Sequence, residues 1–302
     1  MRFVRLLCLS LLIMIFTAQP ALAIDTSLDD QLLLLVNREH TLDAAWQPGD
    51  LLDIARLAPS TKGVMQLRDA AANAYIKMYT AYKEETAGKN LPLNTISGFR
   101  NYNVQKQLFN GKVANRQRAG QSYKTAYNNT LLYTALPGTS EHQTGLAIDL
   151  SNNTGLSDNF RNTEQGQWLL ANCWKYGFIL RYDTNKTSLT GVAYEPWHYR
   201  YVGLPHSLII RDRGWVLEEY MDALHRLPEG ACFEYADPTD AEMIYSVYYT
   251  KDATQDFTDI VNISSDNCGG YVITTRSHRV EELLVAWSEM ALHTPPVPTS
   301  LS

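Results

Sequence analysis

The sequence predicts an α+β protein, because its expected helices and strands follow one another in a mixed order rather than in the regular alternation of a doubly wound fold. Helical periodicity dominates the first two thirds of the chain, with short strand-like segments between the helices. Beyond Trp215, aromatic and β-branched residues gather in short stretches that are typical of strands. For a chain of 302 residues, one domain of ordinary size and a smaller unit are expected.

The N-terminus has the features of a secretory signal peptide. Arg2 and Arg5 precede an apolar run from Leu6 to Phe16, and the small residues of Ala21-Leu22-Ala23 suit a cleavage site. A membrane anchor is the alternative, but this run is shorter than the ~20 apolar residues that span a bilayer. We therefore expect residues 1–23 to be removed and the remaining chain to be exported.

Composition excludes two classes of protein and sets the redox context. The formal net charge is −6 and no basic stripe is present, which argues against a nucleic-acid-binding protein. No later segment is apolar enough to cross a membrane, so an integral membrane protein is not expected. Because disulfides persist outside the cytoplasm, Cys232 and Cys268 are candidates to pair, with a free thiol as the alternative. Cys173 is expected to be a buried structural thiol within a helix.

The larger unit begins with an irregular lead-in at residues 24–60 that is expected to wrap the domain. Residues 64–87 carry apolar side chains at helical intervals and stop at Gly88, as a helix with a left-handed cap would. The elements predicted after this helix are a strand at 93–97, a helix at 102–118, a buried strand at 146–150 reached through a turn, a helix at 163–176, and strands at 178–182 and 199–202.

The C-terminal part is predicted to be a small strand-rich unit. A helix at 216–227 leads to Pro228, and three strands and a helix follow, at 232–235, 244–250, 271–275 and 278–292. We divide the chain into a signal peptide at 1–23, a main domain at 24–228, an accessory unit at 229–293 and a disordered tail at 294–302. The accessory unit could bind a partner, but we expect a strand-rich extension that packs against the main domain.

Two histidines and one aspartate are predicted to hold a metal ion. His142 and Asp149 lie in one segment that contains Gly145, and His198 follows Pro196. Two imidazoles and a carboxylate leave the fourth position of a zinc ion open, as a catalytic site requires, whereas a structural zinc usually takes four protein ligands. Asp149 ends a predicted buried strand, where an unpaired charge is unfavourable and a bound cation gives it a physical reason to be there.

Two further charged residues complete the predicted site. Glu195 is three residues before His198, near enough to act as a general base without ligating the metal. Arg100 supplies a fixed positive charge for a developing oxyanion. On this interpretation the protein is a metal-assisted peptide hydrolase, although salt bridges for Glu195 and Asp149 and carbonyl capping for Arg100 are the simpler alternatives. The remaining histidines are expected to have ordinary core or surface roles: His40, His206, His225, His278 and His293.

Four segments in the same order resemble the VanY-type zinc D-alanyl-D-alanine carboxypeptidases. They are Ser97-Gly98-Phe99-Arg100 followed by Gln105, Pro137 to Asp149, Gly177 to Tyr182, and Glu195 to Tyr201. The resemblance covers about residues 30–215. It implies an α+β fold shared with other zinc D-Ala-D-Ala peptidases and the hedgehog signalling domain, with a central antiparallel sheet at the floor of the cleft.

The resemblance also implies a role for each matching residue. His142, Asp149 and His198 match the zinc ligands, Glu195 matches the general base, and Arg100 matches the arginine that stabilises the transition state or contacts the substrate's terminal carboxylate. Two other positions match residues near the substrate, namely Gln105 and Ser140. The implied substrate is a peptidoglycan stem peptide or its lipid-linked precursor, and the implied location is extracytoplasmic, at the cell wall.

Three alternatives remain open on the sequence alone. Related proteins resemble this chain in all four segments yet act as L,D-carboxypeptidases on tetrapeptide stems, because selectivity depends on the pocket around the penultimate residue. Endopeptidase action on cross-bridges is a variant of the same chemistry. A wall-binding protein that has lost catalysis is the alternative outside enzymes, but all the proposed ligands and Glu195 are present.

Overall fold

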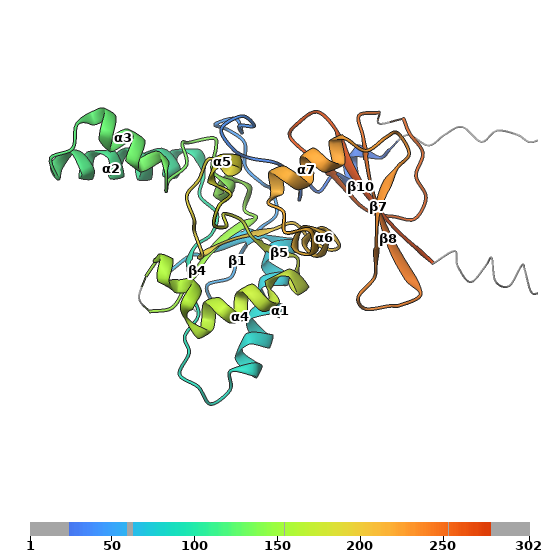
Figure 1. Ribbon diagram of the computed structural model, residues 1–302, viewed down its shortest axis with the longest axis horizontal. Helices are drawn as coiled ribbons and strands as arrows, with labels where there is room; N and C mark the ends of the chain where they lie inside the picture. Colours follow the sequence, from blue (N-terminus) through green and yellow to red (C-terminus); the bar gives the residue numbers. More distant parts are fainter. Residues whose placement is uncertain (1–23, 59–62, 154, 253, 279–302) are drawn as a thin grey trace, which may run out of the picture.

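The computed structural model describes residues 24–58, 63–153, 155–252 and 254–278 (Figure 1). The predicted signal peptide, nearly all of the last predicted helix and the tail lie outside these described residues. The structure confirms the α+β class: the main body carries a four-stranded sheet with helices packed on it, and a second four-stranded sheet lies at the C-terminal end. Among the described helices, none combines the length and apolarity needed to cross a bilayer.

The central sheet is antiparallel throughout and has the strand order β3-β4-β6-β5. Its strands are β3 (Asn94–Ser97), β4 (Ala147–Ser151), β6 (His198–Tyr201) and β5 (Phe178–Leu180). The register places Asp149 opposite His198 on one side and opposite Ser97 on the other. Asp149 and His198, which are 49 positions apart in sequence, are therefore direct neighbours in the sheet.

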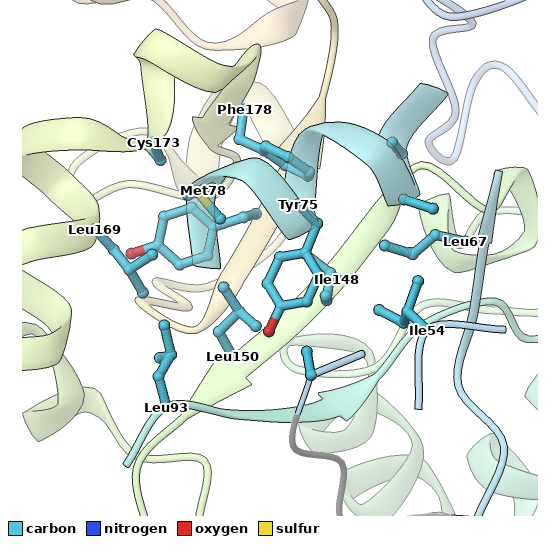
Figure 2. Close-up of a cluster of buried hydrophobic side chains, with 14 of the residues drawn as sticks. Ile54, Leu67, Tyr75, Met78, Leu93, Ile148, Leu150, Leu169, Cys173 and Phe178 are labelled. Carbon is cyan, nitrogen blue, oxygen red and sulfur yellow. The ribbon is translucent and has the colours of Figure 1, made fainter. Parts of the chain in front are cut away.

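Two helices cover one face of this sheet and form the main core with it. They are α1 (Asp69–Glu85) and α4 (Glu164–Asn172), which continues as the short helix η4 (Cys173–Tyr176). In Figure 2, Tyr75 and Met78 of α1 face Ile148 and Leu150 of β4. Cys173 is buried in the same cluster, as predicted. Because all these apolar side chains lie on one face of β4, the polar Asp149 between them must point to the opposite face.

The predicted helix at 64–87 is wrong at its start. Residues Gln66–Arg68 form a strand, β2, which pairs with β1 (Leu51–Asp53), and the helix begins only at Asp69. Met65 and Leu67 are buried while Gln66 and Arg68 are partly exposed, which is the alternation of a strand. The pairing with β1 is a tertiary contact that local periodicity cannot report.

Further helices surround the cleft side and the C-terminal side of the sheet. A hairpin of two helices projects at one end of the molecule in Figure 1, and three other α-helices and three short 3₁₀ helices complete the described helices. These elements are α2 (Tyr102–Arg118), α3 (Tyr123–Leu131), α5 (Thr187–Thr190), α6 (His206–Arg213), α7 (Leu217–His225), η1 (Thr26–Leu28), η2 (Glu141–Thr144) and η3 (Asp158–Asn162). The sequence predicted α2 with these bounds but gave no sign of α3 or α6.

The C-terminal sheet has the order β7-β8-β10-β9. Three of its strands were predicted, and β9 was not: β7 (Cys232–Ala236), β8 (Met243–Thr250), β9 (Ile260–Ser265) and β10 (Tyr271–His278). Val247 and Val272 of this sheet share one core with Leu217 and Leu224 of α7. This packing is what an extension of the main domain would show, while the domain boundary at residue 228 stays a prediction. His278 ends β10 rather than opening a helix.

The lead-in wraps the protein as expected and joins the two sheets. The backbone amides of Asp30 and Leu35 donate to the carbonyls of Ile263 and Asp266, at 2.9 and 3.0 Å. The amide of Leu33 donates to Ser264 Oγ at 2.8 Å. The lead-in therefore runs beside β9 before it reaches the main body of the protein.

The suggested pairing of Cys232 with Cys268 is wrong, since both thiols are free. Cys232 begins the edge strand β7, whereas Cys268 lies in the turn between β9 and β10, with β8 intervening. Neighbouring strands lie ~4.8 Å apart, so the two Cα atoms are separated by more than the ~7 Å that a disulfide can bridge.

Candidate metal centre and active site

Three elements bring the predicted ligands together at the floor of a cavity of about 460 Å³. His142 comes from η2, Asp149 from β4 and His198 from β6. His142 Nε2 lies 3.3 Å from Asp149 Oδ2, and His198 Nδ1 lies 3.1 Å from Asp149 Oδ1. The two imidazole rings are 4.9 Å apart between centroids and almost perpendicular. One nitrogen from each ring and one carboxylate thus converge on the same point.

The turn between η2 and β4 requires glycine. Gly145 ends η2 with a φ of 70°, and a Cβ there would lie only 3.0 Å from the side chains of Arg68 and Leu51. The left-handed conformation and the close approach both favour glycine. This tight turn lets His142 and Asp149, seven residues apart, face the same cavity.

Hydrogen bonds fix which nitrogen of each ring faces the metal position. His142 Nδ1 lies 2.8 Å from the carbonyl oxygen of Gly98, so this nitrogen carries the proton and Nε2 is left toward Asp149. His198 has the opposite orientation, with Nδ1 toward Asp149 and Nε2 at 3.4 Å from Glu141 Oε2. Ring orientation by an outer partner is common for histidines that ligate metals.

The residues present fit a bound zinc ion. The Asp149 side chain is only 7% exposed, yet its Oδ1 atom receives no hydrogen bond from any described residue. A buried carboxylate oxygen without a donor is costly, and a cation removes that cost. Two imidazole nitrogens and a carboxylate oxygen, with one side open to a cavity, are the donor set of a catalytic zinc site.

The electrostatics of the three residues are strongly coupled. Burial lowers the pKa of His142 to about 4, and the nearby Arg100 guanidinium acts in the same direction. Burial also lowers the pKa of His198, but the adjacent carboxylates of Asp149 and Glu141 outweigh it and raise the pKa to about 9. Burial raises the pKa of Asp149, while His142 and His198 hold it well below its ordinary value. The cluster therefore attracts positive charge.

Glu195 and Arg100, the predicted base and cation, lie beside the three residues. Glu195 Oε2 lies 3.8 Å from His198 Nδ1, and burial raises the pKa of Glu195 to about 8. Arg100 Nη1 lies 3.8 Å from Asp149 Oδ2, and both side chains line the cavity. The Glu195 carboxylate, which can exchange a proton, and the Arg100 guanidinium, a fixed cation, thus both lie beside the three candidate ligands.

The two predicted substrate-contacting residues occupy different places. Ser140 lines the cavity and is 3% exposed. Gln105 is fully buried: its Oε1 accepts a hydrogen bond from Arg100 Nε at 2.9 Å, and its Nε2 donates to the carbonyl of Ala135 at 2.7 Å. Gln105 therefore contacts Arg100 directly, and a substrate contact by either residue stays a prediction.

Several residues of the site were not singled out from the sequence. Lys112, Tyr182 and Trp197 line the cavity, and Tyr182 packs on the His198 ring at 4.8 Å between centroids. Glu141 is fully buried beneath the histidines. Its position directly before His142 was visible in the sequence, but its contacts with residues 40 or more positions away were not.

A second group of potential ligands lies near the C-terminal sheet. His225, Asp266 and Cys268 each place one donor atom within 4.8 Å of the others. Here, however, Asp266 Oδ2 accepts from His225 Nε2 at 2.8 Å, and Oδ1 accepts from the amides of Cys268 and Gly270. Because both oxygens of Asp266 have hydrogen-bond partners, this group is explained as a hydrogen-bonded turn, unlike Asp149.

The fold and the first site together define a metallopeptidase type of centre. Comparison with known proteins assigns the family. Residues 64–204 match the family model VanY, described as D-alanyl-D-alanine carboxypeptidase. The bifunctional D-Ala-D-Ala dipeptidase and carboxypeptidase VanXYC of Enterococcus gallinarum is 34% identical over 197 residues, which is 64% of this chain and 94% of that protein. A D-alanyl-D-alanine carboxypeptidase of Enterococcus faecium is 44% identical over 42% of this chain and 36% of its own length.

Solved structures agree with this assignment. The D,D-dipeptidase VanXYg, solved with a D-Ala-D-Ala phosphinate analogue, has a TM-score of 0.64 at 28% identity and covers 81% of this chain and 93% of its own. A VanY D,D-pentapeptidase mutant solved with Zn(II) has a TM-score of 0.54 at 31% identity, covering 64% and 99%. The LD-carboxypeptidase LdcB has a TM-score of 0.55 at 36% identity, covering 63% and 86%. The chain belongs to the VanY family of D-alanyl-D-alanine carboxypeptidases, which are zinc metallopeptidases.

Proposed function

We propose that this protein is an exported zinc carboxypeptidase that removes the terminal D-alanine from peptidoglycan stem pentapeptides or their precursors. The observation that carries the proposal is the convergence of His142, Asp149 and His198 on one point of the cavity, with Asp149 Oδ1 lacking any described hydrogen-bond donor. The VanY relative solved with Zn(II) supports zinc as the metal. When bound, zinc supplies a Lewis acid that lowers the pKa of a ligating water.

Glu195 is the proposed general base and acid. Its Oε2 atom lies 3.8 Å from His198 Nδ1, whereas Asp149 Oδ1 lies nearer to the same nitrogen, at 3.1 Å. A pKa raised by burial means that Glu195 can hold a proton at neutral pH and release it to a departing amine. Positive charge beside the carboxylate favours its ionised form, so loading the site with a cation prepares Glu195 to accept a proton.

Arg100 is the proposed electrostatic partner of the substrate. Its guanidinium is held in place by Gln105 on Nε and by Ser97 on Nη1, and it lines the cavity beside Asp149. A preorganised cation can stabilise the oxyanion that develops on the scissile carbonyl, or bind the terminal carboxylate one residue away. We propose that Gln105 acts by orienting Arg100 and that Ser140 contacts the substrate from the cavity wall.

An L,D-carboxypeptidase acting on tetrapeptide stems is the second candidate function. The LdcB structure favours it, because that LD-carboxypeptidase is 36% identical to this chain, compared with 31% for the VanY D,D-pentapeptidase, at nearly equal TM-scores. The metal ligands do not separate the two activities, since the difference lies in the configuration of the penultimate residue.

Product analysis by mass spectrometry tests the function. Purified protein loaded with zinc is incubated with pentapeptide and tetrapeptide stems in parallel, and a sample stripped by a chelator serves as the control. We expect loss of one alanine from the pentapeptide only. Loss from the tetrapeptide only would move the assignment to the L,D activity, and no cleavage of either stem by a zinc-loaded protein would contradict a carboxypeptidase role.

Export and a location at the cell wall are part of the proposal and are supported by the sequence of residues 1–23. Expression of the full chain in a bacterium, followed by N-terminal sequencing of the protein outside the cytoplasm, tests it. We expect a mature chain that starts near Ile24. Recovery of the uncleaved chain from the cytoplasm alone would refute export.

A further inference from the structure

Glu141 lies at the centre of a buried ionic network directly behind the metal position. Its Oε1 atom accepts hydrogen bonds from Arg181 Nε and from Arg200 Nη1, each at 2.7 Å. Its Oε2 atom lies 3.4 Å from His198 Nε2. The side chains of Glu141, Arg181 and Arg200 are all 0% exposed. The carboxylate of Glu141 is thus shielded from solvent, and its partners are two arginines and a histidine.

The network determines the tautomer of His198. Two guanidinium groups against one carboxylate keep Glu141 ionised, and an ionised carboxylate can only accept hydrogen bonds. The facing atom of His198, Nε2, must therefore carry the proton. In a neutral imidazole this leaves Nδ1 with the free lone pair, and Nδ1 is the atom that faces Asp149 Oδ1 at 3.1 Å.

Outer contacts hold the two arginines and balance the charge. Arg181 makes two hydrogen bonds to the carboxylate of Glu218 on α7, at 2.7 and 2.8 Å. Arg200 Nη2 donates to the carbonyls of Leu32 and Leu34 in the lead-in, each at 2.9 Å. The two glutamates offset the two arginines. The lead-in and α7 are therefore linked through the two arginines to the Glu141 carboxylate, which a purely local role would not require.

We propose that Glu141 is the positioning residue of the metal centre: it holds His198 in the Nε2–H tautomer and so presents Nδ1 to the metal, while Arg181, Arg200 and Glu218 hold Glu141 in place. The inference rests on the proposed function, because it concerns how the predicted zinc site is prepared. Glu141 is among the residues that line the cavity, but its carboxylate is fully buried on the far side of the His198 ring, so it acts through His198. Outer carboxylates of this kind typically change metal affinity by about 10- to 100-fold.

Zinc affinity of Glu141→Gln tests the proposal. Glutamine keeps the shape but loses the charge, and its amide can present a donor to His198. Competition with a chromophoric chelator measures zinc affinity, and the absorption spectrum of the cobalt(II)-substituted protein reports ligand geometry. The matched control is Glu219→Gln, since Glu219 neighbours Glu218 on α7 but pairs with Lys186 at 2.7 Å and stands outside the network.

We expect zinc affinity to fall about 10- to 100-fold in Glu141→Gln, with an altered cobalt spectrum, and to stay within about 2-fold of wild type in Glu219→Gln. A folded Glu141→Gln protein with wild-type affinity and spectrum would overturn the proposal and leave the proposed function intact. A wild-type protein that binds no zinc would overturn both.

Loss of a charge from this network can also prevent folding, because a buried arginine would be left without its partner. A measurement on the wild-type protein then decides the question. Nitrogen-15 NMR of the histidine rings in the zinc-loaded protein identifies the protonated nitrogen of each ring. We expect the proton of His198 on Nε2. A proton on Nδ1 of His198 would refute the role of Glu141 irrespective of any variant.

Discussion

Replacement of His206 by glutamine should weaken the pH dependence of stability, and the size of the effect follows from its burial. His206 is 2% exposed on α6, where Nδ1 lies 2.7 Å from the hydroxyl of Tyr220 and Nε2 lies 3.3 Å from Thr274 Oγ1 of β10. Burial lowers the pKa of His206 from 6.5 to about 3. No charged side chain contacts the ring among its described hydrogen bonds and ring contacts.

The sign follows from proton binding in the two states. Below pH 6.5 the unfolded chain binds a proton on this ring, whereas the folded protein does not bind it until about pH 3. The free energy of unfolding therefore decreases as the pH falls through this interval. Each pH unit corresponds to about 1.4 kcal/mol for one proton, so the contribution of His206 at pH 5 is about 2 kcal/mol.

Urea unfolding of wild type and His206→Gln at pH 7 and pH 5 measures this difference. The wild type should lose about 2 kcal/mol more than the variant between the two pH values, whatever the variant's stability at pH 7. Equal losses in both proteins would mean that His206 is reached by solvent, and would contradict the packing of the C-terminal sheet over α6.

Two further perturbations test the site and the core. His198→Ala should abolish zinc binding and turnover together. Chelation should abolish wild-type activity until zinc is restored, whereas β-lactams that acylate serine enzymes should have little effect. Activity that survives metal removal would contradict the account. In α4, a Cβ at Gly166 would overlap the carbonyl oxygen of Phe160, so Gly166→Ala should destabilise the protein by about 1–3 kcal/mol. Gly111 lies in the open interior of α2, so Gly111→Ala should stabilise the protein by up to about 1 kcal/mol. Chemical unfolding that shows the same sign for both variants would refute this reasoning.

The sequence predicted elements well where their signals are local. Helix α2 begins after Asn101, whose side chain accepts a hydrogen bond from the amide of Val104 at 2.9 Å, and it was predicted with its observed bounds. Helix α4 begins after Thr163, which caps it through Gly166 at 3.1 Å, and η4 ends at Gly177 in the left-handed region. Caps and left-handed glycines act within a few residues, so they can be recognised without the tertiary structure.

Errors occurred where distant partners decide the structure. The strand β2 was predicted as helix because its pairing with β1 overrides the helical intervals of neighbouring residues. Strand β9 was missed although Ile260 and Ile263 are β-branched, since its polar Asn262 and Ser264 face the lead-in. Both cases depend on contacts that no local window contains.

The candidate site was predicted in its inner residues and missed in its outer ones. His142, Asp149 and His198 could be proposed because their residue types and the resemblance point to zinc. Glu141 could not be assigned a role, because it depends on Arg181 and Arg200, which lie 40 and 59 residues further along the chain. Such partners become visible only once the register of β4 and β6 is known.

The central claim is that a zinc ion held by the two histidines and Asp149 works with Glu195 as the proton carrier. Glu195→Gln, assayed side by side with wild type for bound zinc and for release of the terminal alanine, tests it most directly. The account predicts that the variant keeps about one zinc per chain while turnover falls by about 10²- to 10⁴-fold. Near-normal turnover by a zinc-loaded Glu195→Gln protein would contradict it.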